Sequence, residues 1–263
     1  MHYKIHYSCL SHIGNVRNTN QDNFICDKHY MDIRDTRIEF PLFGTKMSND
    51  TSVFGIFDGM GGEECGEVAS YIASKNAFNI KIGKDTIADL FQFCCKANDD
   101  ICTYATLNDV LSMGTTAAML VFTSKGVTLC NIGDSKIFRL HNSILEQISK
   151  DHVSISVFGM KPPLSQNLGI PPKELLIDPY FARGVYNDGD IYLICSDGLT
   201  DMISVNEITK VLIAKPIEEA ITVLLDKALA NGGKDNITII LCKIECQFRY
   251  FFKWKCHTKR KEV

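Results

Sequence analysis

Short runs of apolar residues recur along the chain, several of them rich in Val, Ile and Phe and bounded by Gly, Asp or Asn. Runs of this kind are typical of β-strands that pack in a sheet. The pattern predicts at least one large sheet, with strands at YKIHYSC (3–9), NFICD (23–27), SVFGIFD (52–58), AAMLVF (117–122), VTLCNIG (127–133), KIFRL (136–140), IYLICSD (191–197) and NITIILCKI (236–244).

Three longer segments have the apolar spacing of helices. The first contains Cys65, Ala69 and Ile72, and the second contains Ile87, Leu90, Cys94 and Ile101. Glu63 and Glu64 suit the start of the first helix, because negative charge complements the helix dipole there. A third helix is expected at 217–230, with Pro216 in its first turn. The connections at 34–50 and 153–163 are expected to be irregular.

The composition is that of a folded globular protein, with 263 residues, 45% of them hydrophobic and 22% charged. A formal net charge of -3 provides no general nucleic-acid-binding surface. Residues 247–263 differ from the rest, because they hold six Lys and Arg and one Glu among several aromatics. We expect this tail to finish the last strand and then fray. Contact with an anionic membrane is the less favoured alternative.

The eleven cysteines lie in large part within the strand-like runs, where a thiol packs as a small apolar group. The chain has no CxxC pair, no secretory signal pattern and no run of about 18 apolar residues that could cross a membrane. We therefore expect a reducing, cytoplasmic setting.

Four aspartates stand at the ends of predicted strands. Any one of them is most simply interpreted as a turn residue. Together they predict carboxylates gathered at one edge of a layered sheet, which would repel one another unless a cation lay among them. The four are Asp58, Asp134, Asp197 and Asp235.

The chemistry of these groups favours Mg²⁺ or Mn²⁺ over Zn²⁺, because the ligands are oxygens and the chain lacks a clustered Cys/His set. Gly59 has no Cβ, so its carbonyl could approach a metal, and Gly61 and Gly62 would allow a tight turn into the helix. Arg17 lies five residues before Asp22 and could bind phosphate with both arms of its guanidinium. The alternative for Arg17 is a surface residue in a salt bridge.

Seven motifs in order carry a family resemblance: GNVRNTNQD (14–22), DGMGGEECGEVAS (58–70), MGTTAAMLVF (113–122), NIGDSK (131–136), SKDH (149–152), LICSDGLTDM (193–202) and GGKDNITI (232–239). From about residue 11 to 244 the chain resembles the metal-dependent serine/threonine protein phosphatases of type 2C (PPM), bacterial style. The resemblance implies an α+β fold, a four-layer αββα sandwich of two mostly antiparallel sheets flanked by helices. The phosphatase domain would span 1–246, and 247–263 would be a separate basic and aromatic tail.

The resemblance also assigns roles to residues of the expected site. Asp58 would bridge two metals, Mg²⁺ or Mn²⁺. The remaining ligands would be Asp22 and the Gly59 carbonyl on one metal, Asp197 and Asp235 on the other, and Asp134 with Asp197 at a looser third site. Arg17 would bind the substrate phosphate. The implied activity is hydrolysis of phosphoserine and phosphothreonine in proteins by a metal-activated water, in a monomer that opposes a cognate Ser/Thr kinase.

The chain departs from the family pattern at a few positions. Met60 stands where some eukaryotic relatives have a histidine, and Lys136 stands where an arginine is usual. The flap region near 153–163 is expected to be short, and 34–50 is expected to be an extra loop that helps select substrate. Lone histidines (His2, His6 and His152) are expected to be structural, and Thr115 and Thr116 are expected to be packing or hydrogen-bonding residues near the site. A catalytically weak phosphatase-fold binding module stays open as the alternative function.

Overall fold

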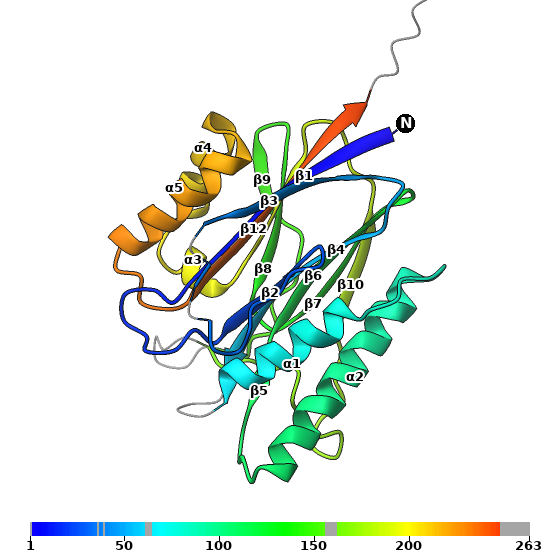
Figure 1. Cartoon of the computed structure of the whole chain (residues 1–263), viewed down its shortest axis with the longest axis vertical. Coiled ribbons are helices and arrows are strands. Elements are labelled where there is room, and N and C mark those ends of the chain that lie inside the picture. Colours follow the sequence, from blue (N-terminus) through cyan, green and yellow to red (C-terminus); the bar gives the residue numbers. More distant parts are fainter. Residues whose placement is uncertain (1, 36, 39, 61–64, 156–161, 248–263) are drawn as a thin grey trace, which may run out of the picture.

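The computed structural model describes residues 2–35, 37–38, 40–60, 65–155 and 162–247. Two stacked antiparallel sheets form its centre (Figure 1). The first has the order β3 (Leu42–Met47), β1 (His2–His12), β12 (Ile237–Gln247), β11 (Ile191–Cys195), β8 (Lys136–His141) and β9 (Ile144–Gln147). The second has the order β10 (Tyr180–Gly184), β7 (Gly126–Ile132), β6 (Ala117–Thr123), β4 (Ser52–Met60) and β2 (Asp22–Cys26), with β5 (Gly114–Thr115) paired to β4.

Helices cover the outer face of each sheet (Figure 1). The helices α1 (Gly66–Phe78) and α2 (Thr86–Leu107) pack on the second sheet, and α3 (Asp197–Thr200), α4 (Val205–Ala214) and α5 (Ile217–Ala230) pack on the first. A capping box starts α4, since the Ser204 hydroxyl and the Glu207 side chain each bond the other residue's backbone N–H.

Three apolar layers hold the sheets and helices together. Because successive side chains of a strand point to opposite faces of the sheet, one strand can contribute side chains to two of these layers. On β12, Ile239 and Leu241 face the helices, whereas Ile240, Cys242 and Ile244 face the space between the sheets. The four layers confirm the predicted αββα sandwich. Each described cysteine is free, and most of those in strands are fully buried, as expected of small apolar groups.

The prediction of an irregular loop at 34–50 was wrong, because its second half forms β3. This strand pairs with β1 at the edge of the first sheet, from Lys4–Met47 to Cys9–Leu42. Its side chains are at most half-buried, so the strand lacks the apolar run that identified the central strands. Sequence patterns also missed β9, β10, α3 and α4, which are short or mostly exposed on one face.

Several other predictions agree with the structure only in part or concern residues that it does not describe. The third helix begins at Ile217, so Pro216 caps it from outside instead of lying in its first turn. Gly61, Gly62, Glu63 and Glu64, most of the shortened flap and the tail beyond Gln247 lie outside the described residues. Across the described ranges, no helix has the length and apolarity needed to span a bilayer.

Candidate active site

Asp22 and Asp58 face each other across two neighbouring strands. Asp22 is the first residue of β2 and is the register partner of Asp58 on β4. Opposed residues of an antiparallel pair point their side chains to the same face of the sheet. Asp58 lies within β4, two residues before its end, and not at the strand terminus that the sequence pattern indicated.

The Asp22 carboxylate is 2% exposed and is held from the opposite sheet. Its Oδ2 accepts hydrogen bonds from the hydroxyls of Ser196 and Thr238, both 2.7 Å long. Its Oδ1 is buried and has no hydrogen-bond partner among the described residues. A buried carboxylate oxygen without a donor is costly, so this position suits a group that brings positive charge.

Thr116 joins Asp58 to the loop that carries Asp134. Its hydroxyl accepts from the Asp58 backbone N–H at 3.0 Å and lies 2.7 Å from the Ser135 hydroxyl. Thr115 Oγ1 donates to the Asp58 carbonyl at 3.0 Å. The prediction that these two threonines make hydrogen bonds near the site is confirmed.

The same loop is tied down on its other side by His152. The Gly133 N–H donates to His152 Nδ1 at 3.3 Å, and the His152 N–H donates to the Gly133 carbonyl at 2.9 Å. Burial lowers the pKa of His152, which favours the neutral ring that this acceptor role needs. Lys136 donates to the Asp134 carbonyl at 3.1 Å and pairs with Asp151. These contacts fix the backbone around Asp134.

Gly59 is needed for packing as well as for any ligand role. A Cβ at this position would collide with the carbonyl oxygens of Gly66, at the start of α1, and Gln21. The Gly59 N–H donates to that same Gln21 carbonyl at 3.0 Å. Only glycine allows β4 to approach both segments this closely.

Arg17 forms the salt bridge that the alternative interpretation expected, and its partner is another candidate site residue. Its Nη2 lies 2.6 Å from Asp235 Oδ2, with the side chains 51% and 36% exposed. The hydrogen bond to Asp235 raises the pKa of Arg17, with smaller contributions from Asp58 and Asp197. Arg17 therefore lies within electrostatic reach of the acids from β4 and α3.

A buried asparagine holds the Arg17 loop against β12. The Asn236 side chain donates to the carbonyls of Ile13 at 2.9 Å and Thr19 at 3.0 Å, and it accepts from the Gln21 N–H at 2.8 Å. Sequence reasoning missed Asn236, as it missed Ser196 and Thr238. Asn236 and Ser196 each adjoin a candidate acid in the chain, which was the available signal.

Burial and neighbouring carboxylates raise the pKa values of two candidate acids, Asp22 and Asp58. Burial raises the pKa of Asp22 from 3.8 to about 7, against the effect of its two hydroxyl donors and with help from Asp197 and Asp235. Burial and then the carboxylates of Asp22, Asp197, Asp134 and Asp235 raise the pKa of Asp58. Asp58, on β4, therefore lies within electrostatic reach of acids from β2, α3 and two loops, and we call these five residues the acid cluster.

The described side chains of the acid cluster do not form a complete set of ligands around one metal position. Among the described side chains, no three from His, Cys, Asp or Glu are arranged to hold one metal ion. Hydroxyl donors engage one oxygen of Asp22, and Arg17 engages one oxygen of Asp235. The oxygen chemistry and the unpartnered Asp22 Oδ1 nevertheless fit a hard divalent cation.

No protein-family model matches the chain. Among curated proteins, the chain is 30% identical over 206 residues to the serine/threonine phosphatase Stp of Listeria welshimeri, covering 71% of this chain and 82% of that protein. It is 29% identical over 220 residues to the serine/threonine protein phosphatase PstP of Mycobacterium tuberculosis, covering 76% of this chain and 43% of PstP.

Solved structures show the same likeness. The catalytic domain of PstP in complex with two manganese ions superimposes with a TM-score of 0.76 at 25% identity, over 93% of this chain and all of that domain. The PstP structure from Mycobacterium tuberculosis also gives 0.76, at 26% identity, over 92% of this chain and all of that one. The chain belongs to the bacterial PPM (type 2C) family of metal-dependent serine/threonine protein phosphatases.

Proposed function

We propose that the chain hydrolyses phosphoserine and phosphothreonine in proteins at a site that holds two divalent cations, Mg²⁺ or Mn²⁺. The observation that carries this proposal is the Asp22 carboxylate, buried opposite Asp58 with one oxygen lacking a donor. Asp22, Asp58 and the Gly59 carbonyl would hold one cation, and Asp58, Asp197 and Asp235 the other. Asp134 is the candidate for a third, looser position with Asp197.

When bound, paired cations lower the pKa of a water between them and offset charge on the attacking and leaving oxygens. The residues of the chain position the acids and bind the substrate. Thr116 and Thr115 fix the backbone of Asp58 through hydrogen bonds on both its N–H and its carbonyl, so the point from which the carboxylate projects is held in place. Ser196 and Thr238 hold Asp22 directly, because both hydroxyls donate to its carboxylate Oδ2.

Arg17 would bind the phosphate of the substrate. Its pairing with Asp235 places the guanidinium at the rim of the acid cluster, half-exposed to an incoming phosphoprotein. If Asp235 turned to a cation, the Nη2 arm of Arg17 would be released, and the guanidinium could then donate to phosphate with both arms. A cognate Ser/Thr kinase is the proposed source of substrate.

The second candidate function is a binding module with the same fold and little catalysis. Such a module would be free to lose its acids, yet this chain keeps an aspartate at each expected position, with Asp22 buried at a cost. The retained acids favour the enzyme.

The test is hydrolysis of p-nitrophenyl phosphate and of a phosphothreonine peptide with Mn²⁺, with Mg²⁺ or with EDTA, for wild type, Asp197→Asn and Arg17→Ala. We expect metal-dependent turnover that Asp197→Asn lowers by at least about 100-fold, and a raised KM in Arg17→Ala. Turnover that survives EDTA would reject the metal mechanism. Absence of turnover with either metal would favour the binding module.

A further inference from the structure

A groove of about 660 Å³ lies beside the candidate active site, and the proposed chemistry does not use it. It is enclosed by the last turns of α2, the turn that follows, β5 and the segment 167–174. Met60, Val110, Leu111, Gly114, Asn167 and Lys173 are among the residues that line it.

The groove begins at the strand that carries Asp58. Met60 and Asp58 are two residues apart on β4, so their side chains leave the same face of the strand. Met60 lines the groove and is 38% exposed. At about 3.3 Å per residue, its Cα lies roughly 7 Å from that of Asp58. Gly114, on the neighbouring β5, is the register partner of Met60. Met60 and Gly114 therefore bring the groove to within two residues of Asp58 along β4.

The walls of the groove are fixed by hydrogen bonds. Thr115 and Leu168 exchange two backbone hydrogen bonds of 2.9 Å. Asn98 Oδ1 accepts from the N–H groups of Gly169 and Ile170, at 2.8 and 3.0 Å. Gly114 leaves no room for a Cβ against Asn167. A preformed groove costs little ordering entropy when a ligand binds.

Exposed apolar side chains line the entrance. Leu111 is fully exposed, and Val110 and Met60 are partly exposed beside it. Lys173 and Glu174 carry opposite charges, so the groove has no strong preference for a charged ligand. Apolar groups grouped at a rigid concave surface next to a site are typical of ligand recognition.

We propose that this groove, which we call the Met60–Leu111 groove, binds an uncharged apolar side chain of the substrate protein close to its phosphorylated Ser or Thr. The inference rests on the proposed phosphatase function and adds a substrate preference to it. An extended peptide advances about 3.3 Å per residue, so the side chain would lie two to four residues from the phosphorylated one. Leu111 and Met60 are the specificity-determining contacts.

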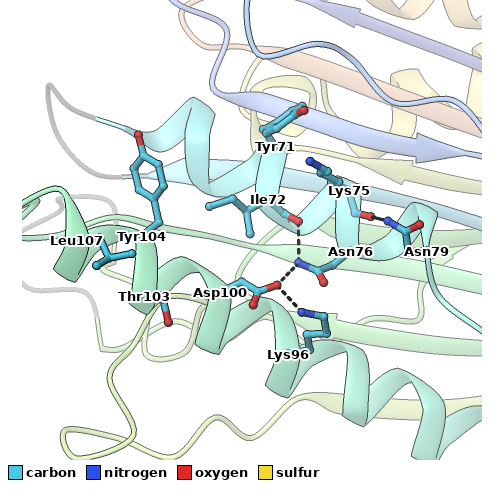
Figure 2. A pocket seen from close by; sticks show the side chains of 10 residues that line it. All are labelled: Tyr71, Ile72, Lys75, Asn76, Asn79, Lys96, Asp100, Thr103, Tyr104 and Leu107. Carbon is cyan, nitrogen blue, oxygen red and sulfur yellow. Dashed lines mark hydrogen bonds and ion pairs between the residues drawn. The ribbon is translucent and has the colours of Figure 1, made fainter.

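The groove between α1 and α2 provides a contrast and a control (Figure 2). Its polar side chains bond one another, with Asn76 and Lys96 both donating to Asp100 at 2.9 and 2.7 Å. None of the candidate site residues lines it. Leu107 at its edge is 78% exposed, which makes it a matched partner for Leu111.

The test compares two phosphothreonine peptides that differ only in Leu or Ser three residues from the phosphothreonine, made with the change on either side. Leu111→Asp and Leu107→Asp are assayed beside wild type. We expect wild type to hydrolyse the better Leu peptide with roughly tenfold higher kcat/KM than its Ser counterpart. Leu111→Asp should remove that preference, whereas Leu107→Asp should keep it and hydrolyse p-nitrophenyl phosphate like wild type.

Equal kcat/KM for all peptides in wild type, or a preference that survives Leu111→Asp, would overturn the groove assignment. So would loss of the preference in both variants. Fluorescence anisotropy of the same labelled peptides separates this inference from the proposed function, because binding needs no turnover. Tighter binding of the Leu peptide that Leu111→Asp removes would support the groove even in a chain without hydrolysis, and equal binding would refute it.

Discussion

Replacing Asp22 by Asn should stabilise the metal-free protein while it impairs the proposed site. The carboxylate is buried, and its pKa is raised from 3.8 to about 7. An acid with a raised folded-state pKa binds its proton more tightly in the folded than in the unfolded chain. The contribution of Asp22 to stability is therefore greatest at low pH and falls as pH rises from about 4 to about 7.

The size of the effect follows from the shift. Each pKa unit corresponds to about 1.4 kcal/mol, so the ionised Asp22 costs at most about 4 kcal/mol above pH 7. Asn keeps an oxygen that can accept from Ser196 and Thr238, and its NH₂ group takes the place of the unpartnered Oδ1. Allowing about 2 kcal/mol for imperfect fit of the amide, we expect a net gain of roughly 2 kcal/mol at pH 8.

The assay is thermal and urea unfolding in EDTA at about pH 5 and pH 8. For a chain of this size, the expected gain raises Tm by about 4–8 °C at pH 8, and by less at pH 5. The matched control is Asp190→Asn. Asp190 is equally buried but is paired with Arg139 at 2.6 Å and His141 at 2.7 Å, so this variant should be destabilised at both pH values. An Asp22→Asn protein that is less stable than wild type at pH 8 would refute the electrostatic reasoning.

Two further variants test the support of the site. Thr116→Val should lose the hydrogen bonds to Asp58 and Ser135, so we expect stability to fall by about 1–3 kcal/mol and turnover to decrease. Thr116→Ser keeps the hydroxyl and should keep both the stability and the turnover of wild type. Equal activity of the two variants would contradict the positioning role of Thr116. Gly59→Ala should fail to fold normally, because its Cβ would collide with the carbonyl oxygens of Gln21 and Gly66. Circular dichroism and expression yield measure this effect. A native-like, stable Gly59→Ala protein would contradict the packing argument.

Much of the fold was predictable because the central strands are buried on both faces. Strands such as β6 and β11 carry unbroken apolar runs, and each was predicted within a residue or two of its observed bounds. The edge strands β3 and β9 have mixed, exposed side chains, and their position depends on pairing with a neighbour that local pattern does not reveal. The same holds for α3, a single turn set by its place after β11.

The acids of the candidate site could be proposed from the sequence, but the residues that contact them could not. The sequence pattern singled out Asp58 and the family resemblance singled out Asp22, and the structure brings these two residues opposite each other. The hydroxyls that hold Asp22 come from residues 174 and 216 positions away, so no local pattern could identify them. The Arg17–Asp235 pair likewise spans 218 positions. The metal-ligand roles themselves stay predictions.

Electron paramagnetic resonance of Mn²⁺ bound to wild type and to Asp58→Asn tests the central claim most directly. Two Mn²⁺ ions bridged by one carboxylate lie about 3.5–4 Å apart and couple magnetically. We predict a coupled spectrum from wild type and only isolated-ion signals, at lower occupancy, from Asp58→Asn. A wild-type spectrum of isolated ions, or a coupled spectrum that survives Asp58→Asn, would contradict the account.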